Sequence, residues 1–299
     1  MRPEPQCQSA PNVQMHYPDP SPESIFDPIL NMNSGKANAT NTMLSHRFRG
    51  KYGLTKSERV ELSLTQRSRL ALELGMYSIA SLSGSTSEPF WATLHAETHS
   101  STAAGAADLL KHIRLLRYES ELVLATPVTT QMASMAKCFL DIITASNCPV
   151  DIRGCFAHVE ISQISAPIGV SLAYGSVSLL HTTGDVNAQA GPDGKIVFAG
   201  CRGNVFLKSG GGIDLKITAN SFDGSMEATT RDSPIRILLP RGFLSSFEMI
   251  APAVIVRADT ALQAERHQTN DQSIVRYGAD EPRLRFRSFQ GPIVVDNPT

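Results

Sequence analysis

Short alternating segments dominate the middle of the chain. A five-residue unit, in which glycine is followed by apolar residues at the third and fifth positions, recurs between residues 150 and 228. Alternation of this kind directs one side of a short strand inward and the other toward water. The clearest copies are residues 175–179, 184–188, 194–198, 203–207, 211–215 and 224–228.

The spacing of these copies favours stacked turns. Successive copies lie about nine residues apart on average, which suits a solenoid better than a hairpin meander. One turn cannot cover its own inner face, so stacking should bury the inner residues, at about 1.5–3 kcal/mol for each fully buried side chain. The expected column consists of Val177, Val186, Ile196, Val205 and Ile213. The pattern therefore predicts a mainly β fold, a single-stranded β-solenoid with glycine at its corners.

The chain before the repeats predicts a small β cap with one helix. Apolar spacing typical of a helix covers residues 101–117, with Ser101 or Thr102 as the N-cap. Strand-like alternation occurs at residues 60–64, 70–74, 77–79, 91–96, 115–125 and 139–143. Such a cap would cover the open end of the first turn.

The chain after the repeats predicts longer strands of the same stack. A turn-rich segment, residues 263–273, is expected to be a mobile excursion, and residues 284–295 are expected to form the last rung. Arg283, Arg285 and Arg287 would then share the outward face of an end strand, where charge discourages edge-to-edge pairing. Anion binding is the alternative role for these arginines.

Three regions are expected. Residues 1–55 are rich in Pro, Asn, Ser and Met without sustained periodicity, which predicts a disordered or loosely ordered tail. Residues 56–130 form the predicted cap, and residues 131–299 the predicted solenoid, continuous with the cap. No secretory signal pattern and no apolar window of membrane-span length are found, which predicts a cytoplasmic protein.

Composition removes several classes of function. A net charge of −1 over 299 residues gives no electrostatic footprint for nucleic acid or for an anionic membrane. The five cysteines have no CxxC spacing, so neither a disulfide framework nor a zinc knuckle is predicted, and most should be small buried hydrophobes. They are Cys7, Cys138, Cys148, Cys155 and Cys201.

The order of several short motifs carries a family resemblance. The motifs are residues 149–152, 158–162, 175–179, 234–240 and 283–293. Together they resemble the bacterial putative-adhesin family of β-helical domains catalogued as domain of unknown function 4097. The resemblance implies a β-helix without a catalytic residue set and a location at the cell surface or in the periplasm. The Asn-Gly corners and the export or anchoring segment usual in that family are absent here.

Three groups of residues resemble ligand sites. Residues 209–212, Ser-Gly-Gly-Gly, look like a phosphate-binding loop, but the strand expected after them favours a tight corner. The Gly-Asp pattern of calcium-binding repeats must recur on successive turns. Here it occurs once, at Asp214, so calcium is not expected. Four His and Cys residues on neighbouring rungs could lie close enough to share a metal ion. They contain no HxH, HxxxH or CxxC pair, so no metal and no cofactor are predicted. The four residues are Cys155, His158, His181 and Cys201.

The predicted function is a non-catalytic structural or adhesin-like interaction protein of unknown ligand. Its partners would be a second copy or another protein at exposed strand edges, or a surface glycan. A polysaccharide-active enzyme is one alternative, and its only candidate acids in the repeats are Asp185, Asp214 and Asp223. A self-assembling cytoplasmic scaffold is the other.

Overall fold

The computed structural model is mainly β, as predicted. It describes residues 52–62, 69–75, 78–87, 89–118, 121–126, 136–269 and 271–298. The predicted tail up to residue 51, Cys7, and parts of the predicted strands at 60–64 and 77–79 lie outside these residues. The described residues belong to one compact unit, Lys51–Thr299, and contain a mixed sheet of 21 strands and one helix, α3 (Ala103–His112).

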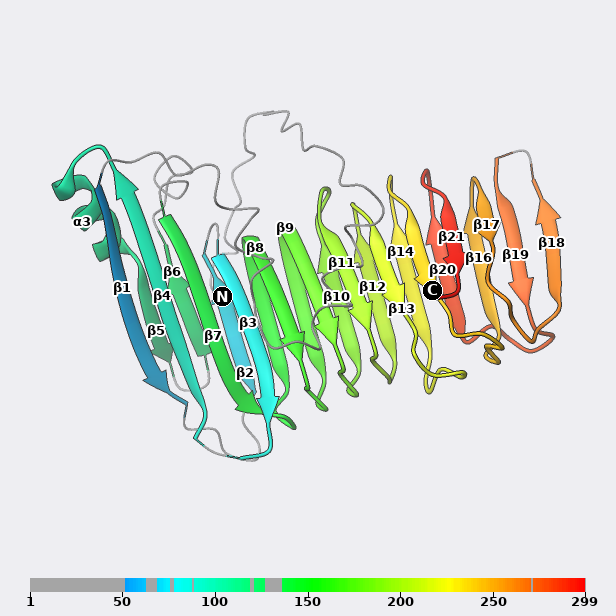
Figure 1. Ribbon diagram of the computed structural model, residues 1–299, viewed down its shortest axis with the longest axis horizontal. Coiled ribbons are helices and arrows are strands. Elements are labelled where there is room, and N and C mark those ends of the chain that lie inside the picture. Colours follow the sequence, from blue (N-terminus) through cyan, green and yellow to red (C-terminus); the bar gives the residue numbers. More distant parts are fainter. Residues whose placement is uncertain are drawn as a thin grey trace, which may run out of the picture. The chain divides into compact units, whose positions relative to one another are not determined.

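The strands are arranged in two ladders (Figure 1). The first ladder contains, in spatial order, β5 (Arg114–Tyr118), β6 (Glu121–Ala125), β2 (Leu70–Leu74), the first half of β8 (Val150–Ser162), the first half of β9 (Ile168–Leu180), β10 (Val186–Ala190), β12 (Val205–Ser209), β14 (Met226–Thr230), β20 (Leu284–Ser288), β16 (Phe247–Ala251), β19 (Ser273–Tyr277) and β18 (Ala264–Gln268). The second contains β1 (Tyr52–Glu61), β4 (Trp91–Ser100), β7 (Ala136–Ala145), β3 (Ser78–Ser85), the second halves of β8 and β9, β11 (Lys195–Ala199), β13 (Ile213–Lys216), β15 (Ile235–Leu238), β21 (Ile293–Asp296) and β17 (Val254–Val256).

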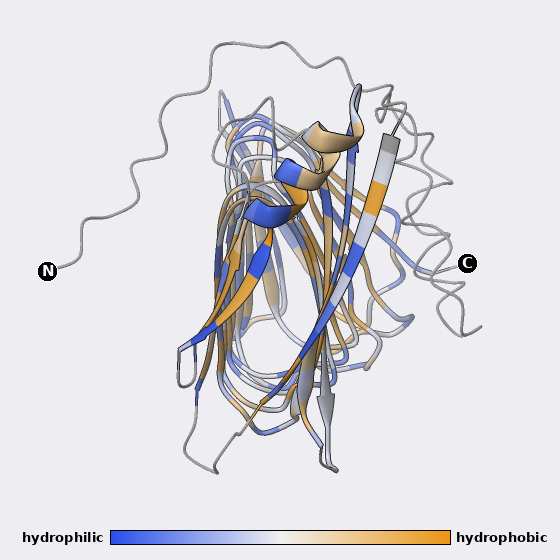
Figure 2. Cartoon of the chain, turned by 90° about the vertical axis from the view of Figure 1, so that its left-hand side faces the viewer, coloured by the Kyte–Doolittle hydropathy of each residue, from blue (hydrophilic) through white to orange (hydrophobic). Residues whose placement is uncertain are grey.

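Parallel pairing links the middle of both ladders, and antiparallel pairs occur toward the ends. The long strands β8 and β9 bend from one ladder into the other, and from β10 to β15 the chain alternates between them. Figure 2, which looks along the stack from the α3 end, shows the ladders as two walls. Inward side chains of both walls join in one buried cluster.

The predicted inner residues are all buried, but they form two columns and not one. Val186 and Val205 lie on the first ladder, and Ile196 and Ile213 lie on the second with Val177. The reason is that the chain passes from one ladder to the other after each glycine unit, so consecutive units lie on opposite walls.

The helix prediction is confirmed in part. The Thr102 hydroxyl accepts a hydrogen bond from the Gly105 amide at 3.0 Å, as an N-cap should. The buried side chains of Ala106 and Leu109 face β4 and β1. The helix ends at His112, because residues 114–118 pair with β6 as β5.

Three predictions for the C-terminal part are wrong. Residues 263–273 contain β18 and lead into β19, which together form an antiparallel hairpin. The arginine strand β20 is not an end strand, because it pairs in parallel with β14 on one side and β16 on the other. The strands beyond residue 222 are also no longer than those before it. A further difference lies at the start, where β1 begins at Tyr52, inside the predicted tail of residues 1–55.

Charges of alternating sign accompany this order of strands. At matching outward positions of β14, β20, β16, β19 and β18 lie Glu227, Arg285, Glu248, Arg276 and Glu265, which we call the charged row. Arg276 Nε lies 3.8 Å from Glu248 Oε2. Arg285 lies 2.8 Å from Glu281, which is on the chain leading into β20. Opposite charges on neighbouring strands favour this pairing, by about 0.2–1 kcal/mol for each pair.

Among the described residues, no helix has the length and apolar character needed to cross a membrane.

The two faces of β10 allow a direct test of the stack. Val186→Asp places an unpaired charge where the side chain is 3% exposed, and it should lower the free energy of unfolding by about 3 kcal/mol or more. Asn187→Asp, one residue further on the exposed face, should change it by less than about 0.5 kcal/mol. Urea denaturation measures both, and equal stability of the two variants would contradict the assigned inner face.

Candidate functional site

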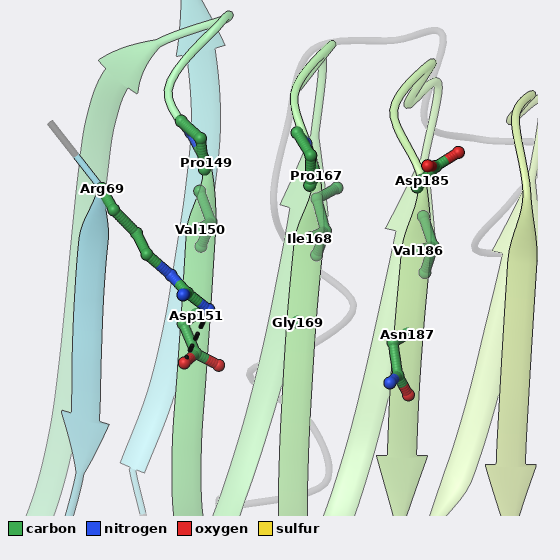
Figure 3. A pocket seen from close by; sticks show the side chains of 10 residues that line it. All are labelled: Arg69, Pro149, Val150, Asp151, Pro167, Ile168, Gly169, Asp185, Val186 and Asn187. Carbon is green, nitrogen blue, oxygen red and sulfur yellow. Dashed lines mark ion pairs between the residues drawn. The ribbon is translucent and has the colours of Figure 1, made fainter. Parts of the chain in front are cut away.

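A groove lies where four strands of the first ladder begin (Figure 3). Its volume is about 630 Å³, and we call it the corner groove. Its polar side chains come from the residue before β2, from β8, from the residue before β10 and from β10 itself. They are Arg69, Asp151, Asp185 and Asn187.

The backbone of the groove is already committed to neighbouring strands. The carbonyl oxygen of Pro149 accepts from the Leu70 amide at 2.9 Å, and that of Pro167 accepts from the Val150 amide at 3.0 Å. The prolines themselves have no amide hydrogen to offer. Recognition in this groove therefore depends on side chains.

Arg69 and Asp151 form an ion pair within the groove. Arg69 reaches across from β2 and places Nη2 2.9 Å from Asp151 Oδ2, as Figure 3 shows. Arg153 lies 3.7 Å from the same oxygen. Because both arginines are well exposed, these pairs contribute at most about 1 kcal/mol and leave the guanidinium groups accessible.

Gly169 leaves a notch between Asp151 and Asn187. The three residues are register partners on β8, β9 and β10. A Cβ at Gly169 would lie 3.0 Å from Asp151 Oδ1 and would crowd the carboxylate. Glycine at this position therefore keeps the floor of the groove open.

A row of outward residues extends from the corner groove along the outer face of the first ladder. Matching positions on β8, β9, β10, β12 and β14 carry Asp151, Gly169, Asn187, Phe206 and Glu227, which we call the binding row. Neighbouring members are about 4.8 Å apart, the spacing of strands. The row thus presents carboxylate, amide and aromatic groups in a straight line, and the charged row begins at its last member, Glu227.

The three candidate acids of an enzyme do not converge. Asp185 lies at the corner before β10, where its Oδ1 accepts from the Asn204 amide at 3.0 Å. Asp223 is an exposed turn residue whose carbonyl accepts from Gly203. Asp214 lies on the second ladder, buried, with its carboxylate 2.5 Å from Lys195 Nζ. Asp214 is therefore engaged in an ion pair with the partly exposed Lys195, on the ladder opposite the one that holds Asp185.

The candidate metal ligands are also separated. The His158 ring forms a hydrogen bond with the Ser176 hydroxyl on β9. The Cys201 thiol donates a hydrogen bond to the carbonyl of Ala199 at 3.2 Å. Burial raises the pKa of the Cys201 thiol and so opposes the thiolate that a metal needs. His181 is exposed beyond the end of β9, and Cys155 is half-buried on β8. In the described part of the chain, no three His, Cys, Asp or Glu side chains form a group suited to a metal ion.

The cysteines follow the prediction in part. Cys138, Cys148 and Cys201 are buried, and burial raises the pKa of Cys138 to about 12. Cys155 is less buried than these three and is disulfide-bonded, which the sequence analysis did not predict.

Residues 209–212 form a tight corner. The Gly211 amide donates to the Gly194 carbonyl at 3.0 Å, and the Gly210 amide donates to the carbonyls of Ala190 and Gly191. These amides therefore cannot also bind a phosphate. A strand, β13, follows the corner instead of a helix.

Sequence reasoning did not find the corner groove. It singled out Asp185 only as a candidate acid, and it did not single out Arg69, Asp151 or Asn187. Arg69 and Asn187 are 118 positions apart in the sequence. Only the register of β2, β8, β9 and β10 brings these residues together.

Gly211 and Gly212 are adjacent at this corner, but only Gly211 is packed closely against the backbone of a neighbouring strand. A Cβ at Gly211 would collide with the Gly194 carbonyl, whereas a Cβ at Gly212 would have its nearest neighbour at 3.4 Å. Gly211→Ala should therefore lower the free energy of unfolding by about 1–3 kcal/mol, and Gly212→Ala by clearly less. Denaturation of both variants is the measurement, and the reverse order would contradict this packing.

His158 should make the fold sensitive to acid. Burial lowers the pKa of His158, while the unfolded chain keeps a value of about 6.5. Its contribution to stability is therefore full above pH about 6.5 and is lost as the pH falls below that value, because the unfolded state takes up the extra proton. His158→Gln should reduce the loss of stability between pH about 7 and pH about 5, measured by urea denaturation. The exposed His95→Gln serves as the control, and an unchanged pH dependence in His158→Gln would contradict the prediction.

Comparison with known proteins gives distant structural similarities. No family model matches the sequence, and no curated protein sequence matches it significantly. A structure of a "putative cell adhesion protein" from Clostridium sporogenes has 13% identity and a TM-score of 0.32, covering 83% of this chain and 100% of its own. A "putative adhesin" from Bacteroides fragilis has 12% identity and a TM-score of 0.43, covering 83% and 98%. A "putative lipid binding protein" from Parabacteroides distasonis has 6% identity and a TM-score of 0.35, covering 82% and 97%. At these identities and TM-scores, the alignments assign neither a family nor a ligand to this chain.

Proposed function

We propose that this chain is a non-catalytic binding protein, built on a β-solenoid, whose first ladder binds a hydroxyl-rich polymer such as a surface glycan. The solenoid interpretation is supported by the alternation of short strands between two parallel ladders from β10 to β15. Such a stack gives a rigid outer face with side chains at regular spacing.

The observation that carries the ligand class is the binding row. Phe206 is half-buried on the outer face, with Asn187 and Glu227 at matching positions on its two sides. An aromatic ring packs against the apolar face of a sugar ring, and amide and carboxylate groups bind its hydroxyls. A polymer lying across the strands would meet a new side chain about every 4.8 Å, a distance close to the length of one sugar unit in an extended chain.

The corner groove would accept one end of this polymer. Arg69 remains accessible, and the notch at Gly169 admits a substituent that a larger side chain would block. Balanced charge on Asp151 and Arg69 favours a neutral or mixed polar ligand over a strongly anionic one.

Non-catalytic binding is preferred to the enzyme alternative because of the acids. A glycoside hydrolase needs two carboxyl groups on the two sides of the bond that it cleaves. Asp185 and Asp223 lie at corners of the first ladder, and Asp214 is buried against Lys195 on the second. Self-assembly, the remaining alternative, is compatible with binding and rests on other residues.

Phe206→Ala should weaken binding of soluble cell-surface oligosaccharides about tenfold, because the aromatic platform is removed. The probe is a panel of neutral and acidic oligosaccharides, with affinities measured by isothermal titration calorimetry. Tyr118→Ala, an exposed aromatic residue on β5 outside the binding row, is the matched control and should bind normally.

Three outcomes would contradict the proposal. They are an unchanged affinity in Phe206→Ala, the absence of binding to any member of the panel by the unsubstituted protein, and release of shortened oligosaccharides during incubation. The last of these would favour the polysaccharide-active enzyme.

A further inference from the structure

The rung formed by β20 and β21 is placed out of sequence order. It lies between the rung β14–β15 and the rung β16–β17, both of which precede it in the chain. Figure 1 shows these late strands between earlier ones. We call residues 284–296 the inserted rung, and the space that it occupies the slot.

The two walls of the slot match each other. Met226 on β14 and Phe247 on β16 are both register partners of Leu284, and both strands run parallel to β20. On the second ladder, Ile235 and Val254 are both register partners of Ile293. Either wall therefore presents the same direction and register to whatever strand lies between them.

The inserted rung cannot remain exposed to water. Leu284, Phe286, Ile293 and Val295 are at most 1% exposed, and β20 and β21 both have strands on their two sides. If the rung leaves its slot, its apolar side chains and backbone groups need an equivalent site. The slot of a second copy is such a site, and it offers the same contacts.

The chain leading into the rung permits this movement. Residues 279–281 are exposed, and Gly278 has a φ of +90°, which glycine adopts without strain. Glu227 and Glu248 of any copy would meet Arg285 in the same register. Charge therefore favours the rung of a second copy as much as the protein's own.

We infer that the inserted rung is an exchangeable element through which one copy of this protein binds another, with residues 284–296 of each copy occupying the slot of its neighbour. Reciprocal exchange gives a closed dimer, and exchange in one direction gives a chain of copies. This is strand addition with a strand pair that already has a place in the monomer. The inference shares only Glu227 with the binding row and does not use the corner groove, so it does not depend on the proposed function.

Engineered disulfides test the exchange. Glu227 and Arg285 are register partners on neighbouring strands, at the strand spacing of about 4.8 Å, which is within the range for a disulfide. Full-length Glu227→Cys and full-length Arg285→Cys are unfolded together, refolded at high concentration and oxidised. We expect a 227–285 disulfide between chains, identified by peptide mass spectrometry in a dimer or larger species.

Two controls make the result specific. The double variant Glu227→Cys/Arg285→Cys, purified without unfolding, should form the same disulfide within one chain, which shows that both substitutions preserve the fold. Glu227→Cys mixed with Arg287→Cys should not cross-link, because Arg287 is the register partner of Thr229.

A second cysteine pair separates exchange of the rung from exchange of a larger block. In rung exchange, Arg285 of one copy also lies beside Glu248 of the other, so Glu248→Cys and Arg285→Cys should cross-link between chains. If residues 247–296 moved as one block, that contact would stay within a chain and only the 227–285 bond would join two chains. That outcome would overturn the inference, as would purely monomeric products or oligomers without the 227–285 bond.

Discussion

Backbone hydrogen bonding on both sides of each short strand in the interior of the ladders is the constraint on which this fold depends. β10 has five residues, too few to form a stable structure alone, and it bonds to β9 on one side and β12 on the other. The corners continue the same ladders, since Ile168, Val186 and Val205 each donate at 2.8 Å to the carbonyl of the corresponding corner residue on the next turn. Because buried amides and carbonyls must be paired, each turn requires its neighbours.

This constraint separates the inner from the outer face. Inward positions are committed to one apolar cluster, whereas outward positions on the first ladder carry little structural cost and are free to hold polar groups. The binding row and the charged row are both built on such outward positions, at the spacing that the ladder imposes. The side chains proposed to bind and the side chains that stabilise the fold are therefore different residues of the same strands.

The inserted rung shows that stacking leaves the order of turns open. β14, β20 and β16 have the same direction and the same alternation of buried and exposed residues, so each is compatible with either neighbour. The charged row distinguishes them, because Arg285 between Glu227 and Glu248 places opposite charges side by side, whereas direct contact of β14 with β16 would pair two carboxylates. Electrostatics on the outer face thus supports an order that packing alone does not select.

Local pattern accounts for the strands, the helix with its Thr102 cap, and the burial of the inner residues, because alternation and capping depend on neighbours in the chain. The tight corner at residues 209–212 follows in the same way, from glycine before a strand. No short segment of the sequence specifies which distant strands pair. Only the tertiary structure therefore divided the inner residues into two columns, placed β20 inside the stack, and joined Arg69, Asp151 and Asn187 at one groove. The physical reason is that strand order and register depend on hydrogen bonds and contacts between strands far apart in the sequence. The two-residue alternation within one strand does not determine which strands pair or in which register.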